Sequence, residues 1–127
     1  MSAVNQGNSH ISFIFELKIT DPEKCLDFMK NEAVPYTSDL DEPKTKRFEW
    51  YVSPDKQNAT LIEFFEDSDG AKLRIDNLLS SHLLEIFQSL FEIESFIVLG
   101  DVKDDLKEIL DGFGADYRDY AAGFLRA

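Results

Sequence analysis

Apolar and polar side chains alternate along residues 9–19, "SHISFIFELKI", and this period of two predicts a β-strand. One face of the strand is wholly apolar, and the other face is mixed. Two more alternating runs lie within residues 41–71, "DEPKTKRFEWYVSPDKQNATLIEFFEDSDGA", and the turn signal "SPDKQNA" between them predicts a hairpin. A fourth strand is predicted at residues 93–102, "IESFIVLGDV".

In the segments between these strands, apolar residues recur at helical spacing, which predicts helices there. Residues 20–33 predict a first helix, which Pro35 is expected to end because proline cannot continue it. Residues 67–92 predict a second helical stretch, broken near Ser80, whose apolar positions form a buried stripe. A third helix is predicted after residue 101.

The predicted order is β-α-β-β-α-β, followed by a C-terminal helix and tail. This order is typical of an α+β, ferredoxin-like fold, in which two helices cover one face of an antiparallel sheet. At 127 residues the chain is predicted to be one domain, residues 1–127, with a loose N-terminus at 1–8 and a tail at 113–127.

The second face of this sheet carries too many large side chains to lie in water. Besides one aromatic set of the hairpin, we expect Ile14, Phe96 and Val98 on it. A patch of that size is larger than monomers usually expose, so we predict a homodimer that packs sheet face against sheet face. The alternative is that the third helix and the aromatic tail fold back over this face.

Composition narrows the function classes. The net charge of −12 repels phosphate backbones, so neither nucleic acid nor an anionic membrane surface is an expected partner. A single cysteine, Cys25, allows no internal disulfide, and two distant histidines make a His-built metal site improbable. Neither a secretory signal nor an apolar run of membrane-spanning length is visible, so a cytoplasmic location is expected.

The runs "DEPKTKRFEWYVS" and "LIEFFEDSDGAKL" carry a family resemblance. They are similar to the antibiotic-biosynthesis-monooxygenase-like proteins of the dimeric α/β-barrel superfamily, over residues 10–100. The matching positions are Glu42, Pro43, Thr45, Phe48, Trp50, Tyr51, Glu63, Phe65, Asp67, Ser68 and Ala71. Two positions depart from the pattern: Lys44 replaces a common glycine, and Arg74 stands where many relatives carry a histidine.

The resemblance implies a cofactor-independent monooxygenase-like enzyme that uses neither a cofactor nor a metal and acts on a small aromatic or quinol compound. Such chemistry needs a dry aromatic cavity with polar groups that hold or deprotonate a phenolic oxygen. Glu63 would accept a proton, and Arg74 would stabilise a phenolate. The catalytic candidates are Glu63 and Arg74, and the substrate-binding candidates are Trp50, Tyr51, Asn77 and His82.

Each candidate has a structural alternative. Trp50 can be core or dimer-interface packing, Arg74 a solvated surface residue, and His82 a helix-start histidine. The competing function is therefore a non-enzymatic homodimer of the same fold that binds a small molecule or a partner.

Overall fold

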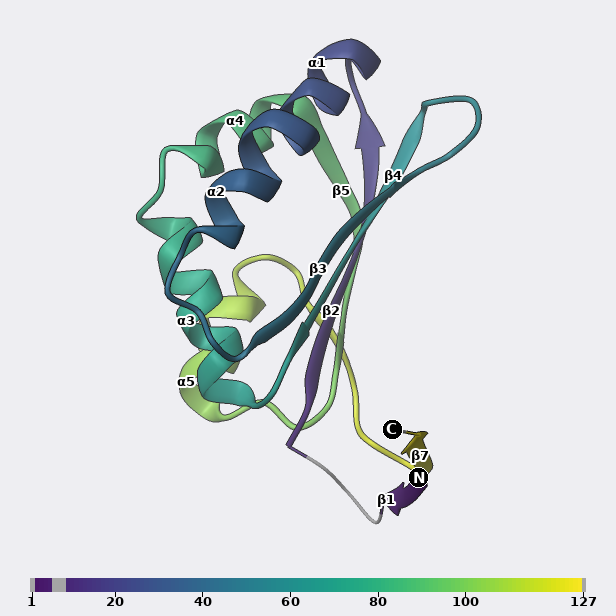
Figure 1. The fold of residues 1–127 in the computed structure, drawn as a ribbon, viewed down its shortest axis with the longest axis vertical. Coiled ribbons are helices and arrows are strands. Elements are labelled where there is room, and N and C mark those ends of the chain that lie inside the picture. Colours follow the sequence, from purple (N-terminus) through teal and green to yellow (C-terminus); the bar gives the residue numbers. More distant parts are fainter. Residues whose placement is uncertain (1, 6–8, 127) are drawn as a thin grey trace.

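The chain forms one large sheet with its helices on one side (Figure 1). The structure is a computed structural model that describes residues 2–5 and 9–126. The strands are β1 (Ser2–Asn5), β2 (Ile11–Ile19), β3 (Thr45–Val52), β4 (Asn58–Phe65), β5 (Phe91–Leu99), β6 (Asp116–Arg118) and β7 (Gly123–Arg126). The helical segments are α1 (Pro22–Asp27), the π-helical η1 (Phe28–Ala33), α2 (Val34–Ser38), α3 (Ser68–Leu79), α4 (Leu83–Leu90) and α5 (Asp104–Asp111).

The large sheet has five strands in the order β3-β4-β2-β5-β6. Neighbours are antiparallel except β6, which runs parallel to β5 at the sheet edge. The predicted α+β class is thus confirmed, but the sheet is mixed rather than purely antiparallel. The parallel strand comes from the tail, where Tyr117 pairs with Val98.

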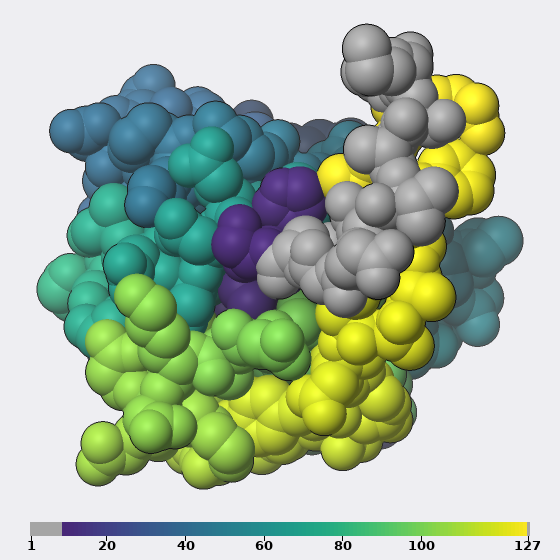
Figure 2. All heavy atoms as spheres, turned by 90° about the horizontal axis from the view of Figure 1, so that it is seen from below, coloured from purple at the N-terminus to yellow at the C-terminus, as the bar shows by residue number. Residues whose placement is uncertain are grey.

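The two ends of the chain pair with each other. β1 and β7 form a separate two-stranded antiparallel sheet, which lies apart from the large sheet at the lower end of Figure 1. Residues 2–5 were predicted to be loose and instead form β1, while residues 1 and 6–8 lie outside the described residues. In the view from below, the C-terminal tail runs along one side of the molecule (Figure 2).

The first helical region passes through Pro35, so the prediction that it ends there was wrong. Proline lacks an N–H and crowds the carbonyl four residues earlier, which breaks a regular α-helix. Here the turn before it widens: Val34 N–H donates to the Met29 carbonyl, five residues back. Pro35 then falls in the first turn of α2, where its missing donor is tolerated, and the helix continues to Ser38.

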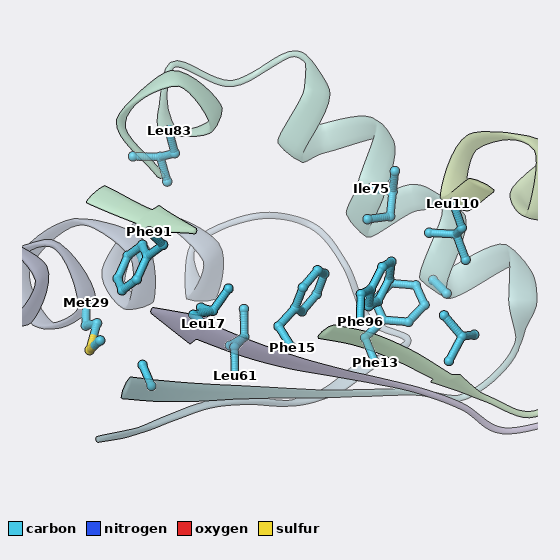
Figure 3. Packing of buried hydrophobic residues seen from close by; sticks show 14 of the residues in the cluster. Phe13, Phe15, Leu17, Met29, Leu61, Ile75, Leu83, Phe91, Phe96 and Leu110 are labelled. Carbon is cyan, nitrogen blue, oxygen red and sulfur yellow. The ribbon is translucent and has the colours of Figure 1, made fainter. Parts of the chain in front are cut away.

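Aromatic side chains dominate the core between the sheet and the helices. Phe15 and Phe96 stack with their ring centroids 4.1 Å apart, and Ile75 and Leu110 reach them from the helix layer (Figure 3). Phe96 and Val98 therefore lie on the helix-covered face, a correction to their predicted place on the other face. Strand alternation relates residues within β5 but does not say which set faces the helices.

Candidate functional site

A cavity of ≈ 70 Å³ lies within the core, between the sheet and the helix layer. Its wall is almost entirely apolar and comes from both layers. The sheet contributes Phe15, Phe48, Trp50, Leu61, Glu63 and Ile93; the helices contribute Phe28, Ala33, Thr37, Arg74, Ile75, Leu78, Leu83, Leu84, Phe87 and Gln88; Phe113 follows α5. Glu63 and Arg74 are the two side chains with ionisable groups in this wall.

Glu63 places a carboxyl group where the strand pattern puts apolar side chains. It lies on β4 between Leu61 and Phe65, on the helix-covered face, and only 4% of its surface is exposed. In the sheet register it stands opposite Phe48 on one side and Phe13 on the other. Among the described residues, no hydrogen bond or ion pair holds this carboxyl group.

The charge state of Glu63 follows from this burial. Loss of water is the main cause that raises its pKa from 4.5 to about 7; the Arg74 charge opposes this rise, and the Glu42 charge adds to it. A carboxyl group with a pKa near neutrality exchanges a proton readily at physiological pH, which is what a general acid or base requires.

Arg74 belongs to a buried network on the helix side of the cavity. It lies on α3 with 3% of its surface exposed, and its Nη1 is 3.3 Å from Oε2 of Glu42. The Asn77 amide donates to Oε2 of Glu42 at 2.8 Å, and the Thr45 hydroxyl donates to Oε1 at 2.9 Å. Glu42 is therefore anchored from three sides, and it keeps a compensating charge next to the buried guanidinium.

Trp50 lines the cavity from β3 and is surrounded by other rings. The indole stacks on Phe91 at 5.4 Å and contacts Phe28, Phe48 and Phe87 at 6.1–6.4 Å. Its Nε1 atom is buried and has no hydrogen-bond partner among the described residues. Trp50 therefore both packs in the core and lines the cavity.

The structure brings some of the predicted site residues together and separates others. Glu63, Arg74 and Trp50 line one cavity. Tyr51 does not, because alternation turns it to the opposite face, where it is 48% exposed and accepts a hydrogen bond from Arg47. Asn77 acts on Glu42 from behind the cavity wall, and His82 is exposed before α4, with its ring 5.4 Å from the Tyr36 ring.

Sequence reasoning missed two contributions to the site. Glu42 was noted only as part of a motif, although Thr45 three residues later is a local signal for a side-chain contact. Among the lining residues of α4, Leu84 and Phe87 were predicted only as part of a buried stripe, and Gln88 was not predicted at all. A stripe indicates which face of a helix is buried, but it does not show whether that face meets other side chains or an empty space.

Comparisons with known proteins identify the fold. No family model matches the chain, and no curated protein matches its sequence. A crystal structure of MupZ from Pseudomonas fluorescens matches 96% of this chain and 93% of its own, with 15% identity and a TM-score of 0.73. Two structures with TM-scores of 0.51 match less of this chain: the structural-genomics protein YJCS (71% of this chain, 96% of its own, 22% identity) and a conserved protein from Methanosarcina mazei Go1 (70%, 89% and 20%). At these identities the likeness extends to the fold alone.

Residues 2–5 and 9–126 contain neither a metal-binding cluster nor a membrane-spanning helix. No three His, Cys, Asp or Glu side chains gather there in a group able to hold a metal ion. None of the helices in this part of the chain is long and apolar enough to cross a membrane.

Proposed function

We propose that the cavity is the active site of an enzyme that acts on a small aromatic compound, with Glu63 as the group that accepts a proton. The observation that carries this proposal is the Glu63 carboxyl group itself. It is buried in an apolar wall, lacks a hydrogen bond or ion pair among the described residues, and has a pKa of about 7. Natural cores rarely bury a carboxyl group in this way without a use for it.

The reaction we propose is cofactor-independent oxygenation of a phenol or quinol, the activity implied by the family resemblance. Glu63 takes the hydroxyl proton, and the positive charge of Arg74 stabilises the phenolate oxygen. The electron-rich ring then reacts with O₂: one oxygen atom enters the ring carbon next to the hydroxyl to give an ortho-quinone, and the other leaves as water. For phenol itself this balances as C₆H₆O + O₂ → C₆H₄O₂ + H₂O.

Oxygen uptake with a panel of phenols and quinols tests this proposal. Glu63→Gln keeps the size of the side chain and removes the base, so uptake is expected to fall by about 10²–10⁴-fold. The matched control is Glu94→Gln, which makes the same change at an exposed position of β5 and should leave the rate unaltered. Equal rates in the wild type and Glu63→Gln would rule out Glu63 as the base.

The size of the cavity favours a second candidate, a dimer that binds a ligand without turnover. A volume of ≈ 70 Å³ is half of the about 150 Å³ that accommodates benzene in a protein core. An aromatic ligand therefore requires part of the wall to move outward. The short helix α4 is the part we expect to move, since Leu83 is its one buried residue. Ligand binding without oxygen uptake, in the wild type and in Glu63→Gln alike, would favour this candidate.

We also propose a ferredoxin-like, dimeric α/β-barrel assembly. The order β3-β4-β2-β5 within the sheet is the arrangement that two β-α-β units produce when they interleave. The face away from the helices carries Ile62, Ile14 and Ile97 side by side on three neighbouring strands. A second copy packed on this row by two-fold symmetry would cover it.

A further inference from the structure

Two buried N–H donors line the cavity without a hydrogen-bond acceptor. They are Nε1 of Trp50 and Nη1 of Arg74, and neither is hydrogen-bonded within the described residues. For Arg74 this holds even though Oε2 of Glu42 lies 3.3 Å away, because the geometry of that contact is ionic only. A buried donor that has lost water and found no acceptor is costly, so such donors are rare and call for an explanation.

Aromatic rings surround the indole, and Nε1 has no hydrogen-bond acceptor among the described residues. The rings that contact Trp50 belong to Phe28, Phe48, Phe87 and Phe91, and none of them carries an oxygen or nitrogen atom. A molecule in the cavity is then the natural source of an acceptor for this N–H.

The two donors stand on different walls of the cavity. Trp50 comes from the sheet, where it pairs with Leu61, one strand position away from Glu63 on the same face of β4. Arg74 comes from α3 in the helix layer, together with the charge that acts on Glu63. A ligand that satisfies both donors must therefore carry two hydrogen-bond acceptors on separate parts of its body, and the acceptor for Arg74 lies near the Glu63 carboxyl group.

We infer that the substrate is a single-ring phenol that also carries a conjugated carbonyl group on the opposite side of the ring. Its hydroxyl oxygen lies between Glu63 and Arg74, and its carbonyl oxygen accepts the hydrogen bond of Trp50 Nε1. The inference rests on the proposed function, because it names the substrate class of the same cavity. The remainder of the wall is apolar and suits the ring between the two oxygen atoms in polarity, and an outward movement of α4 would give the ring its room.

The acidity of such a compound suits the site. An unsubstituted phenol resembles the tyrosine side chain, whose pKa is about 10 and lies far above that of Glu63. A conjugated carbonyl group spreads the phenolate charge onto its own oxygen and lowers the pKa of the hydroxyl towards that of Glu63. The hydroxyl proton then passes to the Glu63 carboxylate, the negative charge stays on the ring oxygens, and no electron leaves the substrate in this step.

Binding of four single-ring probes in the absence of O₂ tests the inference. The probes are 4-hydroxybenzaldehyde, phenol, benzaldehyde and toluene, which carry both groups, the hydroxyl, the carbonyl or neither. Isothermal titration calorimetry of the wild type should show 4-hydroxybenzaldehyde binding about ten-fold or more tightly than either phenol or benzaldehyde, since each probe with one oxygen leaves a buried donor unpaired. Toluene should bind most weakly.

Two substitutions at neighbouring residues of β3 test whether Trp50 binds the carbonyl oxygen of the probe. Trp50→Phe removes the N–H and keeps an aromatic ring, so the preference for 4-hydroxybenzaldehyde over phenol should disappear. Tyr51→Phe removes a polar hydrogen from the adjacent residue, which faces away from the cavity, and should keep the wild-type preference. A preference that survives in Trp50→Phe, or its absence in the wild type, would overturn the inference.

The failure of this inference and the failure of the proposed function have different signatures. Binding is measured without O₂, so the ratio between the two probes contains no contribution from turnover. If no probe binds, the inference falls, and the oxygen-uptake comparison of the wild type with Glu63→Gln still decides the proposed function by itself. Loss of the probe preference together with Glu63-dependent uptake would leave an oxygenase with a different substrate class.

Discussion

The two faces of the sheet break the expected pattern of apolar and polar residues in opposite ways. On the helix-covered face of β4, the carboxyl group of Glu63 lies between the apolar Leu61 and Phe65. On the other face of the same strand, Ile62 and Phe64 are only half-buried, beside Thr60. The covered face thus holds an ionisable group of a kind usually found in water, and the open face holds apolar side chains of a kind usually found in a core.

The difference separates two uses of one strand. Residues that contradict the local pattern reduce the stability of the isolated chain. Their presence therefore indicates that something outside the isolated chain needs them. On the covered face we propose that this need is a ligand, because Glu63 borders a cavity. On the open face we propose that it is a second copy of the sheet, because no second layer of described residues packs on the row of Ile62, Ile14 and Ile97 (Figure 1).

The largest expected effect follows from breaking the buried charge network of the covered face. Arg74→Met removes the guanidinium and leaves the carboxylate of Glu42, which is 8% exposed, without its compensating charge. Removal of one partner of a buried ion pair typically costs about 3–5 kcal/mol, so urea denaturation at pH 7 should show a loss of this size.

The control for Arg74→Met lies on the same helix. Lys72→Met breaks the 2.8 Å ion pair with Asp76, whose two side chains are only half-buried, and should cost less than about 1 kcal/mol. Adding Glu42→Gln to Arg74→Met should recover part of the stability, because no uncompensated charge then remains. Equal losses in Arg74→Met and Lys72→Met would show that the buried pair is not special.

Adjacent phenylalanines on β4 give the next largest contrast. Phe65 is fully buried against Phe13, with ring centroids 4.8 Å apart, whereas Phe64 points to the open face. Phe65→Ala should therefore cost about 3–5 kcal/mol of unfolding free energy. Phe64→Ala should cost clearly less when measured by denaturation at low protein concentration, where an association of sheets contributes least. A larger loss for Phe64 would mean that the open face is already packed.

Much of the fold was predictable because strand and helix periods are local properties. The alternation in residues 9–19 and around Trp50 gave β2 and β3, and the break near Ser80 separated α3 from α4. The π-helical turn before Pro35 was not predictable. It depends on hydrogen bonds between an N–H and the carbonyl five residues earlier, and the amino-acid sequence carries no clear signal for that spacing. The pairing of β6 with β5 also depends on a contact between distant parts of the chain.

The candidate site was predictable only in part, for a similar reason. The sequence shows Glu63 as a single carboxylate within an apolar strand. It also shows the family resemblance of the segment that contains Trp50. The face that Tyr51 occupies also follows from alternation, although the family pattern included it. The network around Glu42 requires a loop, a strand and α3 to meet, which only the folded chain shows.

A smaller effect concerns the pH dependence of stability. Glu63 has a pKa of about 7 in the folded chain against an ordinary value of 4.5, so the folded state holds the proton more tightly. Its contribution to stability is therefore complete below pH 4.5 and is lost as the pH rises through 7, by about 3 kcal/mol in total. Unfolding free energies across this range should fall for the wild type.

Two variants separate this effect from other titrations. Glu63→Gln cannot ionise, so the difference in unfolding free energy between it and the wild type should change between pH 4.5 and 7 and level off above. Glu94→Gln, exposed on β5, should follow the wild type at every pH. If Glu63→Gln keeps the full wild-type pH dependence, the Glu63 pKa is not raised.

The smallest effect on the stability of one chain, and the sharpest test of the open face, is expected from Ile14→Lys. Ile14 is half-buried at the centre of the apolar row, between Ile62 and Ile97, so a lysine there can extend its charge into water with little strain on its own chain. The same charge in a dimer would lie between two sheets, so sedimentation should show a wild-type dimer and a monomeric variant. Leu73→Lys, at an exposed apolar position of α3, is the control and should stay dimeric. A wild type that sediments as a monomer at every concentration would contradict self-association through the apolar row of the open face. The two faces would then still differ in the chemistry of their side chains, but the open face would not bind a second copy of the chain.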